Sequence, residues 1–196
     1  MWPWEHVAFG YVVYSIAVHL GYRDDPGEGE AVAVVFGSLL PDLIDKPLAW
    51  QFGVFESGYA LGHSIFFAGP VSLVAIALAR AHGRTRVGFA FAVGYIFHLV
   101  GDVIPIYVSQ SVWSVDHLLW PVVVVENPHG HEGFFAGFVH NFEPYLAQLL
   151  AGEVTPYLVG QLGLGLAAVG LWVFDGAPGV NAARRGAHRV FEIARR

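Results

Sequence analysis

Cysteine is absent from this sequence of 196 residues. Disulfide bonds, thiolate zinc sites and cysteine nucleophiles are therefore excluded, and any bound metal must be held by nitrogen and oxygen ligands. Lysine is nearly absent, because all basic residues except Lys46 are arginine. The net charge of -6 and a single basic cluster, in the C-terminal tail, argue against a nucleic-acid partner, which would need clustered Lys and Arg.

Charge of either sign is scarce in this chain. Charged residues make up 13% of the sequence and hydrophobic residues 55%, whereas soluble domains carry about 25% charged residues. This composition predicts an integral membrane protein, and the length predicts one domain. The first residues lack the basic region of a cleavable signal peptide, so we expect the first apolar stretch to remain as a membrane span.

Apolar segments predict an all-α integral membrane protein with about five transmembrane helices and short or re-entrant segments that line a polar site. The predicted spans are residues 6–22, 59–79, 87–108 and 155–174, and the shorter apolar segments are 31–40, which could span together with 41–45, and 112–125. Residues 126–152 mix phenylalanine with polar residues and predict an interfacial helix or lid. One transmembrane domain then covers residues 1–175, and a basic cytoplasmic tail covers 176–196.

Two prolines are expected to interrupt helices. Proline disfavours helical backbone in the residue before it, so we expect a helix to end at Leu40 and to present Asp42 from a turn. Pro105 likewise marks a helix end or kink, three residues after Asp102. Both predicted breaks lie beside ionisable residues.

The distribution of arginine predicts the topology. Arginine-rich short loops stay in the cytoplasm, so the loop at residues 80–86 and the C-terminal tail are placed inside. The N-terminus then lies on the outer side of the cell membrane, by which we mean the inner or plasma membrane. Under this topology the ionisable residues of the apolar segments gather near the outer face.

Ionisable residues inside apolar segments are costly and indicate a functional site. Three segments, 41–45, 62–64 and 98–102, together with the first span supply His6, Asp42, Asp45, His63, His98 and Asp102. Asp42 and Asp45 are three residues apart, and His98 and Asp102 are four residues apart. Either spacing places two side chains on one face of a helix. An isolated His–Asp pair commonly ties helices together, but three clustered carboxylates would repel one another without a cation. We predict that these six residues bind one or two divalent metal ions, with Zn²⁺ favoured and Mn²⁺ or Mg²⁺ as alternatives.

A metal held in this way can activate water for attack on an ester, a phosphoester or an amide. Asp42, Asp45 and Asp102 are the candidate catalytic residues, because an aspartate that does not bind the metal would serve as general base. The sequence thus predicts a metal-dependent hydrolase whose partners are membrane lipid and a lipid-like or amphipathic substrate. An ion or proton-coupled transporter or channel, and a non-catalytic membrane protein with a structural metal site, are the alternatives.

The order of these motifs resembles the YdjM-like family of predicted membrane-bound metal-dependent hydrolases. The resemblance covers about residues 6–121 and rests on His6, on the segments 37–45, 62–64 and 94–102, and on Leu118-Leu119-Trp120-Pro121. By position, it implies that the same six residues are the metal and catalytic residues. The chain has Ala60-Leu61-Gly62 where the family usually has Arg-Gly and a Thr or Ser, so an arginine that could hold a phosphate is missing.

The remaining polar residues are assigned lesser roles. We expect His19 to pack between helices or at the interface, and Asp116-His117 to support the site or contact the substrate. Ser64 is expected to form hydrogen bonds, because no Gly-x-Ser-x-Gly motif surrounds it. A last group is interpreted as a polar outer loop, with metal binding as the alternative: His129, His131, Glu132 and His140.

Overall fold

The structure is a computed structural model that describes residues 1–126 and 133–180. These residues form helices and no strand, so the predicted all-α fold is confirmed for them. The α-helices are α1 (Pro3–Tyr22), α2 (Glu28–Lys46), α3 (Ile65–Ala81), α4 (Thr85–Gln110), α5 (Phe134–Leu150) and α6 (Pro156–Phe174). Two short helical turns, η1 (Pro47–Gln51) and η2 (Asp116–Leu118), complete the secondary structure.

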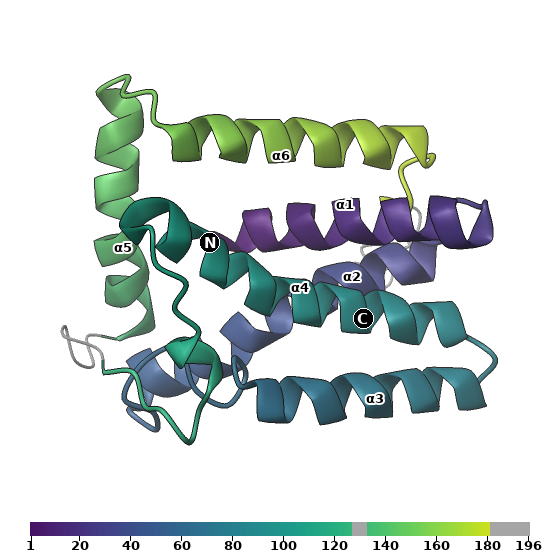
Figure 1. The fold of residues 1–196 in the computed structure, drawn as a ribbon, viewed down its shortest axis with the longest axis horizontal. Helices are drawn as coiled ribbons and strands as arrows, with labels where there is room; N and C mark the ends of the chain where they lie inside the picture. Colours follow the sequence, from purple (N-terminus) through teal and green to yellow (C-terminus); the bar gives the residue numbers. More distant parts are fainter. Residues whose placement is uncertain (127–132, 181–196) are drawn as a thin grey trace, which may run out of the picture.

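The helices α1, α2, α3, α4 and α6 run lengthwise through the molecule, and α5 crosses one end of this bundle (Figure 1). α4 is central, because it packs against α1, α2 and α3, while α6 packs against α1. Residues 85–108 of α4 and the whole of α6 are long and apolar enough to cross a membrane, and α3 is apolar but shorter. The count of five transmembrane helices stays a prediction.

The contact between α2 and α4 depends on glycine. A Cβ atom at Gly37 of α2 would overlap the carbonyl oxygen of Phe91, and one at Gly94 of α4 would overlap that of Val34. The two backbones can approach this closely only because both glycines lack a side chain. This close approach places the C-terminal half of α2 beside the middle of α4, and these two helices carry most of the candidate site.

The predicted helix end at Leu40 is wrong. α2 continues through Pro41 as far as Lys46. Proline removes one backbone hydrogen bond, but membrane helices tolerate this loss where neighbouring helices pack around it, and Pro41 is buried. Asp42 is therefore presented from a helix and not from a turn. α4 likewise continues through Pro105 to Gln110.

Other predicted segments differ in their limits. The predicted span at 59–79 starts as a loop, and α3 begins only at Ile65, where the Ser64 hydroxyl accepts a hydrogen bond from the Phe66 amide at 3.2 Å. The segment 112–125 forms turns around η2. α5 lies within the region that predicts an interfacial helix or lid, and none of its side chains is buried. The predicted basic tail lies outside the described residues from position 181 onward.

Asp175 ties α6 to α1 at the end of the bundle opposite α5. Its carboxylate accepts hydrogen bonds from the hydroxyl groups of Tyr11 at 2.6 Å and Ser15 at 2.8 Å. His19 Nε2 lies 2.8 Å from the other carboxylate oxygen. The place of His19 agrees with the helix-packing role expected for it.

Candidate metal centre

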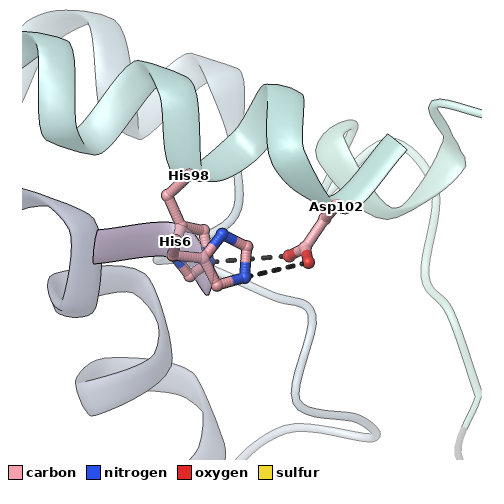
Figure 2. Close-up of side chains that lie close together, drawn as sticks. All are labelled: His6, His98 and Asp102. Carbon is pink, nitrogen blue, oxygen red and sulfur yellow. Dashed lines mark ion pairs between the residues drawn. The ribbon is translucent and has the colours of Figure 1, made fainter. Parts of the chain in front are cut away.

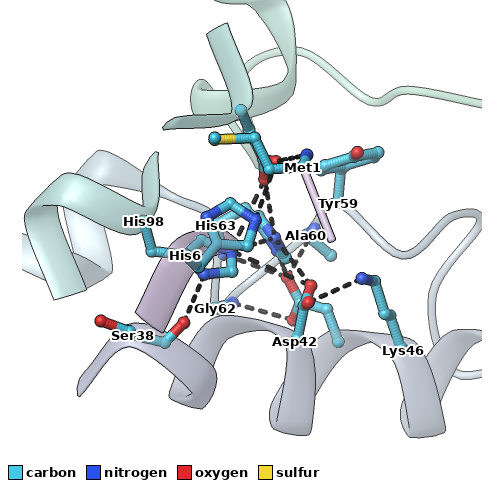
Figure 3. Close-up of polar contacts among 12 residues, drawn as sticks. Met1, His6, Ser38, Asp42, Lys46, Tyr59, Ala60, Gly62, His63 and His98 are labelled. Carbon is cyan, nitrogen blue, oxygen red and sulfur yellow. Dashed lines mark hydrogen bonds and ion pairs between the residues drawn. The ribbon is translucent and has the colours of Figure 1, made fainter. Parts of the chain in front are cut away.

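Five buried ionisable side chains converge near the end of the bundle that α5 crosses (Figure 3). None of them is more than 7% exposed. They are His6 from α1, Asp42 from α2, His63 from the loop before α3, and His98 and Asp102 from α4. The sixth predicted residue, Asp45, is buried against His63. The structure thus brings together all six residues that the sequence singles out.

Four ligand atoms in this group face one another. The Nε2 atoms of His63 and His98 are 3.1 Å apart. Asp102 Oδ2 lies 3.5 Å from each of these nitrogens. Asp42 Oδ1 lies 3.5 Å from His63 Nε2 and 3.9 Å from His98 Nε2. We call these four side chains the ligand cluster.

The other ring nitrogen of each histidine in the ligand cluster already has an acceptor. His98 Nδ1 donates to the Ser38 carbonyl oxygen at 2.6 Å, and His63 Nδ1 lies 2.8 Å from Asp45 Oδ2. A neutral imidazole carries one N–H, so these partners assign the proton to Nδ1 in both rings and leave a lone pair on each Nε2. An added proton would satisfy one of the four converging acceptors, whereas a divalent cation would satisfy all four.

The distances from the two histidine nitrogens of the ligand cluster to each other and to the two carboxylates are close to those between ligands of a tetrahedral ion. Zn²⁺ binds histidine nitrogen and carboxylate oxygen at about 2.0–2.2 Å, so two ligand atoms at corners of a tetrahedron lie about 3.3–3.6 Å apart. The measured separations run from 3.1 to 3.9 Å. Nitrogen and carboxylate donors also suit this ion. The residues therefore fit the divalent metal that the sequence predicts.

His6 extends the ligand cluster on its α1 side. Its ring stacks on the His98 ring with centroids 3.6 Å apart, and its Nε2 lies 3.2 Å from Asp102 Oδ1 (Figure 2). The Met1 amino group also donates to Asp102 Oδ1, at 2.7 Å. His98 Nδ1 is bonded to the Ser38 carbonyl oxygen, so only Nε2 is available to a metal and His98 can bind only one ion. The ligand cluster is thus complete for one ion, whereas a second would have His6 and one oxygen of Asp102.

Comparison with known protein families identifies the family of this chain. The family described as YdjM inner membrane protein matches residues 1–176. The chain belongs to this family. Searches of curated proteins and of solved structures give no match. The match runs from α1 through α6, so it includes every residue of the ligand cluster, and the family name indicates an inner membrane protein.

In this member of the YdjM family, Asp45 is placed differently from the other five predicted residues. Its carboxylate accepts hydrogen bonds from the backbone amides of Ala60 at 2.8 Å, Gly62 at 2.8 Å and His63 at 3.0 Å, and it faces His63 Nδ1. Both carboxylate oxygens are therefore engaged with N–H groups. This arrangement holds the loop before α3 on α2 and orients the His63 ring. A direct bond from Asp45 to the metal stays a prediction that this geometry does not favour.

The replacement Asp45→Asn tests this orienting role. Asparagine keeps the size of the side chain but has a single acceptor oxygen in place of two, so it cannot hold both the loop amides and His63 Nδ1–H. We expect metal affinity to fall by about 10–100-fold, the range typical for residues that orient a ligand. Zn²⁺ titration of the purified protein measures this, with Asp24→Asn as the control because Asp24 is exposed in the loop between α1 and α2. Equal affinity in Asp45→Asn and the wild type would contradict the role.

Two groups near the site were not predicted from the sequence. Lys46 Nζ lies 2.7 Å from Asp42 Oδ2, and the Ser38 carbonyl oxygen orients His98. A charged residue four positions from Asp42 on an apolar helix could have indicated the first of these groups. No sequence signal indicates the second, because every residue has a carbonyl group.

The glycines beside the histidines have a packing role. Gly62 and Gly101 are expected to make room for an ion or a substrate. A Cβ atom at Gly62 would lie 2.8 Å from the Pro41 carbonyl oxygen, and one at Gly101 would lie 3.1 Å from His6 Nδ1. The space beside Gly62 is therefore filled by α2, and the space beside Gly101 is filled by Met1 and His6. The absence of side chains at the two glycines allows the ligands to come close to one another.

The remaining predicted polar residues lie outside the ligand cluster. His117 is buried, its ring meets that of Tyr59 edge to face at 5.4 Å, and burial lowers its pKa below the usual value. Ser64 donates to the Trp120 carbonyl oxygen at 2.6 Å, as a hydrogen-bonding role requires. His140 lies on α5. The other members of the polar loop, His129, His131 and Glu132, lie outside the described residues.

A cavity of about 820 Å³ opens beside the ligand cluster. Asp42 and Lys46 line it from α2, and Tyr59 lines it from the loop before α3. Apolar residues supply most of the remaining wall, including Trp50 and several phenylalanines of α5. The site is therefore reached from a large, mainly apolar space at the end of the bundle.

Proposed function

We propose that this protein is a membrane-embedded metal-dependent hydrolase that acts on a lipid-like or amphipathic substrate. One observation carries the proposal: two histidine nitrogens and two carboxylate oxygens converge in the ligand cluster, directly beside a large apolar cavity. A metal that only stabilised the fold would not need an open space next to its ligands. The membrane setting and the aromatic walls favour a substrate with an apolar tail.

The residues divide the chemistry among them. His63, His98 and Asp102 would hold a divalent ion, which would supply activation of water and polarisation of the bond to be cleaved, while Asp42 would give up its place beside the ion to that water. Asp42 both belongs to the ligand cluster and lines the cavity. It is therefore placed to accept the proton of the attacking water. Asp45 and the Ser38 carbonyl keep the two histidine rings in the tautomer that binds metal.

The position of α5 supports an interfacial substrate. α5 crosses the end of the bundle, and its exposed apolar residues include Phe135, Phe138 and Leu150 (Figure 1). A helix with this placement suits the boundary between acyl chains and headgroups. A substrate could then reach the cavity from the lipid without leaving the membrane. This route agrees with a site near the outer face, as the arginine distribution predicts.

The core of the bundle favours hydrolysis over conduction. Between the ligand cluster and the His19–Asp175 end, the described residues include a buried cluster with Val18, Val34 and Ala90. An ion or proton path would require polar groups or water at this level. The buried ionisable side chains of the described residues gather instead at the two ends of the bundle.

Activity can be tested on purified protein in detergent with a panel of long-chain p-nitrophenyl esters, phosphoesters and amides. We expect at least one class to be hydrolysed, hydrolysis to stop after chelation of the metal, and Zn²⁺ or Mn²⁺ to restore it, because the activated water depends on the ion. The His98→Ala variant should remain inactive after metal is added. Turnover that survives both chelation and His98→Ala would refute the proposal.

A further inference from the structure

Lys46 contacts the ligand cluster through Asp42 and also lines the cavity. Its Nζ lies 2.7 Å from Asp42 Oδ2, and its side chain lines the cavity wall (Figure 3). The side chain is 21% exposed, so the ammonium is neither buried in the core nor free in solvent. Among residues 1–126 and 133–180, no other Lys or Arg side chain lines this cavity.

The ammonium group has donors to spare. An ammonium group offers three N–H donors, and Asp42 is the single ion-pair partner of Lys46 in the described part of the chain. The Trp50 ring lies 5.8 Å from Nζ and supports the positive charge without accepting a conventional hydrogen bond. Two donors of a cation are thus available to an oxyanion in the cavity.

The surroundings of Lys46 fix the shape of such a ligand. Trp50 and Phe138 line the same cavity, and the ring of Trp50 packs near Gly137 of α5. The cation therefore lies at the base of an aromatic space wide enough for an alkyl chain. The loop before α3 lies against the Lys46 stem at Gly58 and helps to hold the side chain in place.

We propose that the cavity binds an anionic amphiphile, with a phosphate-like oxyanion on Lys46 and an alkyl tail against Trp50 and Phe138. This proposal rests on the proposed function, because it identifies the substrate class of the same site. The oxyanion would be held beside Asp42 and the ligand cluster, where the ester bond next to it meets the attacking water. Phosphoesters of lipid type fit this arrangement better than neutral esters do.

Binding can be measured without catalysis by calorimetric titration with dodecylphosphonate, which has no ester bond to cleave. We expect Lys46→Gln to weaken binding about tenfold or more, since hydrogen bonds to charged groups contribute about 1.5–3 kcal/mol. Lys46→Arg keeps the charge and should bind within about threefold of the wild type, which also shows that position 46 tolerates replacement. Arg80→Gln is the control, because it removes the same charge at an exposed position at the end of α3 that does not line the cavity.

Two further titrations use the wild type alone and do not depend on any variant. Dodecyltrimethylammonium should bind much more weakly than dodecylphosphonate, and inorganic phosphate should bind more weakly because it has no tail. Equal binding of the two dodecyl probes, or of wild type and Lys46→Gln, would overturn the proposal. Binding of inorganic phosphate as tight as that of dodecylphosphonate would overturn the proposal that the ligand has an alkyl tail bound in the cavity.

The same titrations, set beside the hydrolysis assay of the wild type, separate this proposal from the proposed function. Lys46-dependent binding in a wild type that hydrolyses none of the substrates would support the anion site while the proposed function fails. Hydrolysis of neutral esters with no phosphonate binding would leave the hydrolase in place and refute the anion site.

Discussion

The replacement of His98 by alanine is expected to abolish tight binding of a divalent metal. His98 Nε2 is shared by both groups of candidate ligands, the one with Asp42 and His63 and the one with His6 and Asp102. A single substitution therefore removes a ligand from every arrangement that these residues can form. We expect the affinity for Zn²⁺ to fall about 100-fold or more, beyond the loss typical of residues that only orient a ligand.

The measurement combines elemental analysis of the purified protein with Zn²⁺ titration of the metal-free form. The wild type should bind about one equivalent, because the ligand cluster is complete for one ion. His82→Ala is the matched control, since His82 is exposed at the end of α3 and its Nδ1 bonds to the Leu78 carbonyl oxygen of its own helix. If His98→Ala binds Zn²⁺ as tightly as His82→Ala does, the ligand cluster is not a metal site.

The replacement Gly37→Ala is expected to destabilise the protein severely. The new methyl group would overlap the Phe91 carbonyl oxygen, which belongs to the backbone of α4 and cannot rotate away. Overpacking of this kind costs about 1–3 kcal/mol, and more where a backbone must move. The separation of α2 from α4 would also move Asp42 away from His98, so metal affinity should fall together with stability.

Thermal unfolding in detergent and Zn²⁺ titration of the folded fraction measure the two effects. Gly160→Ala is the control, because Gly160 lies on α6 with no atom within 4 Å of the added Cβ. That substitution should leave stability unchanged or raise it by up to about 1 kcal/mol, since alanine favours the helix. A Gly37→Ala protein that unfolds at the wild-type temperature would contradict the close contact between α2 and α4.

Much of the candidate site could be predicted from the order of residues. His98 and Asp102 share a face of α4 because four residues make about one helical turn, and both point into the ligand cluster. Their burial in an apolar chain also follows from sequence, since isolated charges there are costly and mark function. The helical limits were less predictable. Pro41 indicates a break by local preference, but packing around α2 keeps the helix continuous.

The sequence alone determined that this is an all-helical chain of a membrane protein family, and that any metal it binds must be held by nitrogen and oxygen ligands such as histidine and aspartate. Only the tertiary structure decided how those residues divide their work. Asp42 and Asp45 are three residues apart and chemically identical, yet one faces His63 Nε2 and the other His63 Nδ1. Helical spacing sets the face of a side chain, whereas the loop before α3 sets which side of the His63 ring each carboxylate meets. That loop is positioned by contacts between distant segments, which no local pattern encodes.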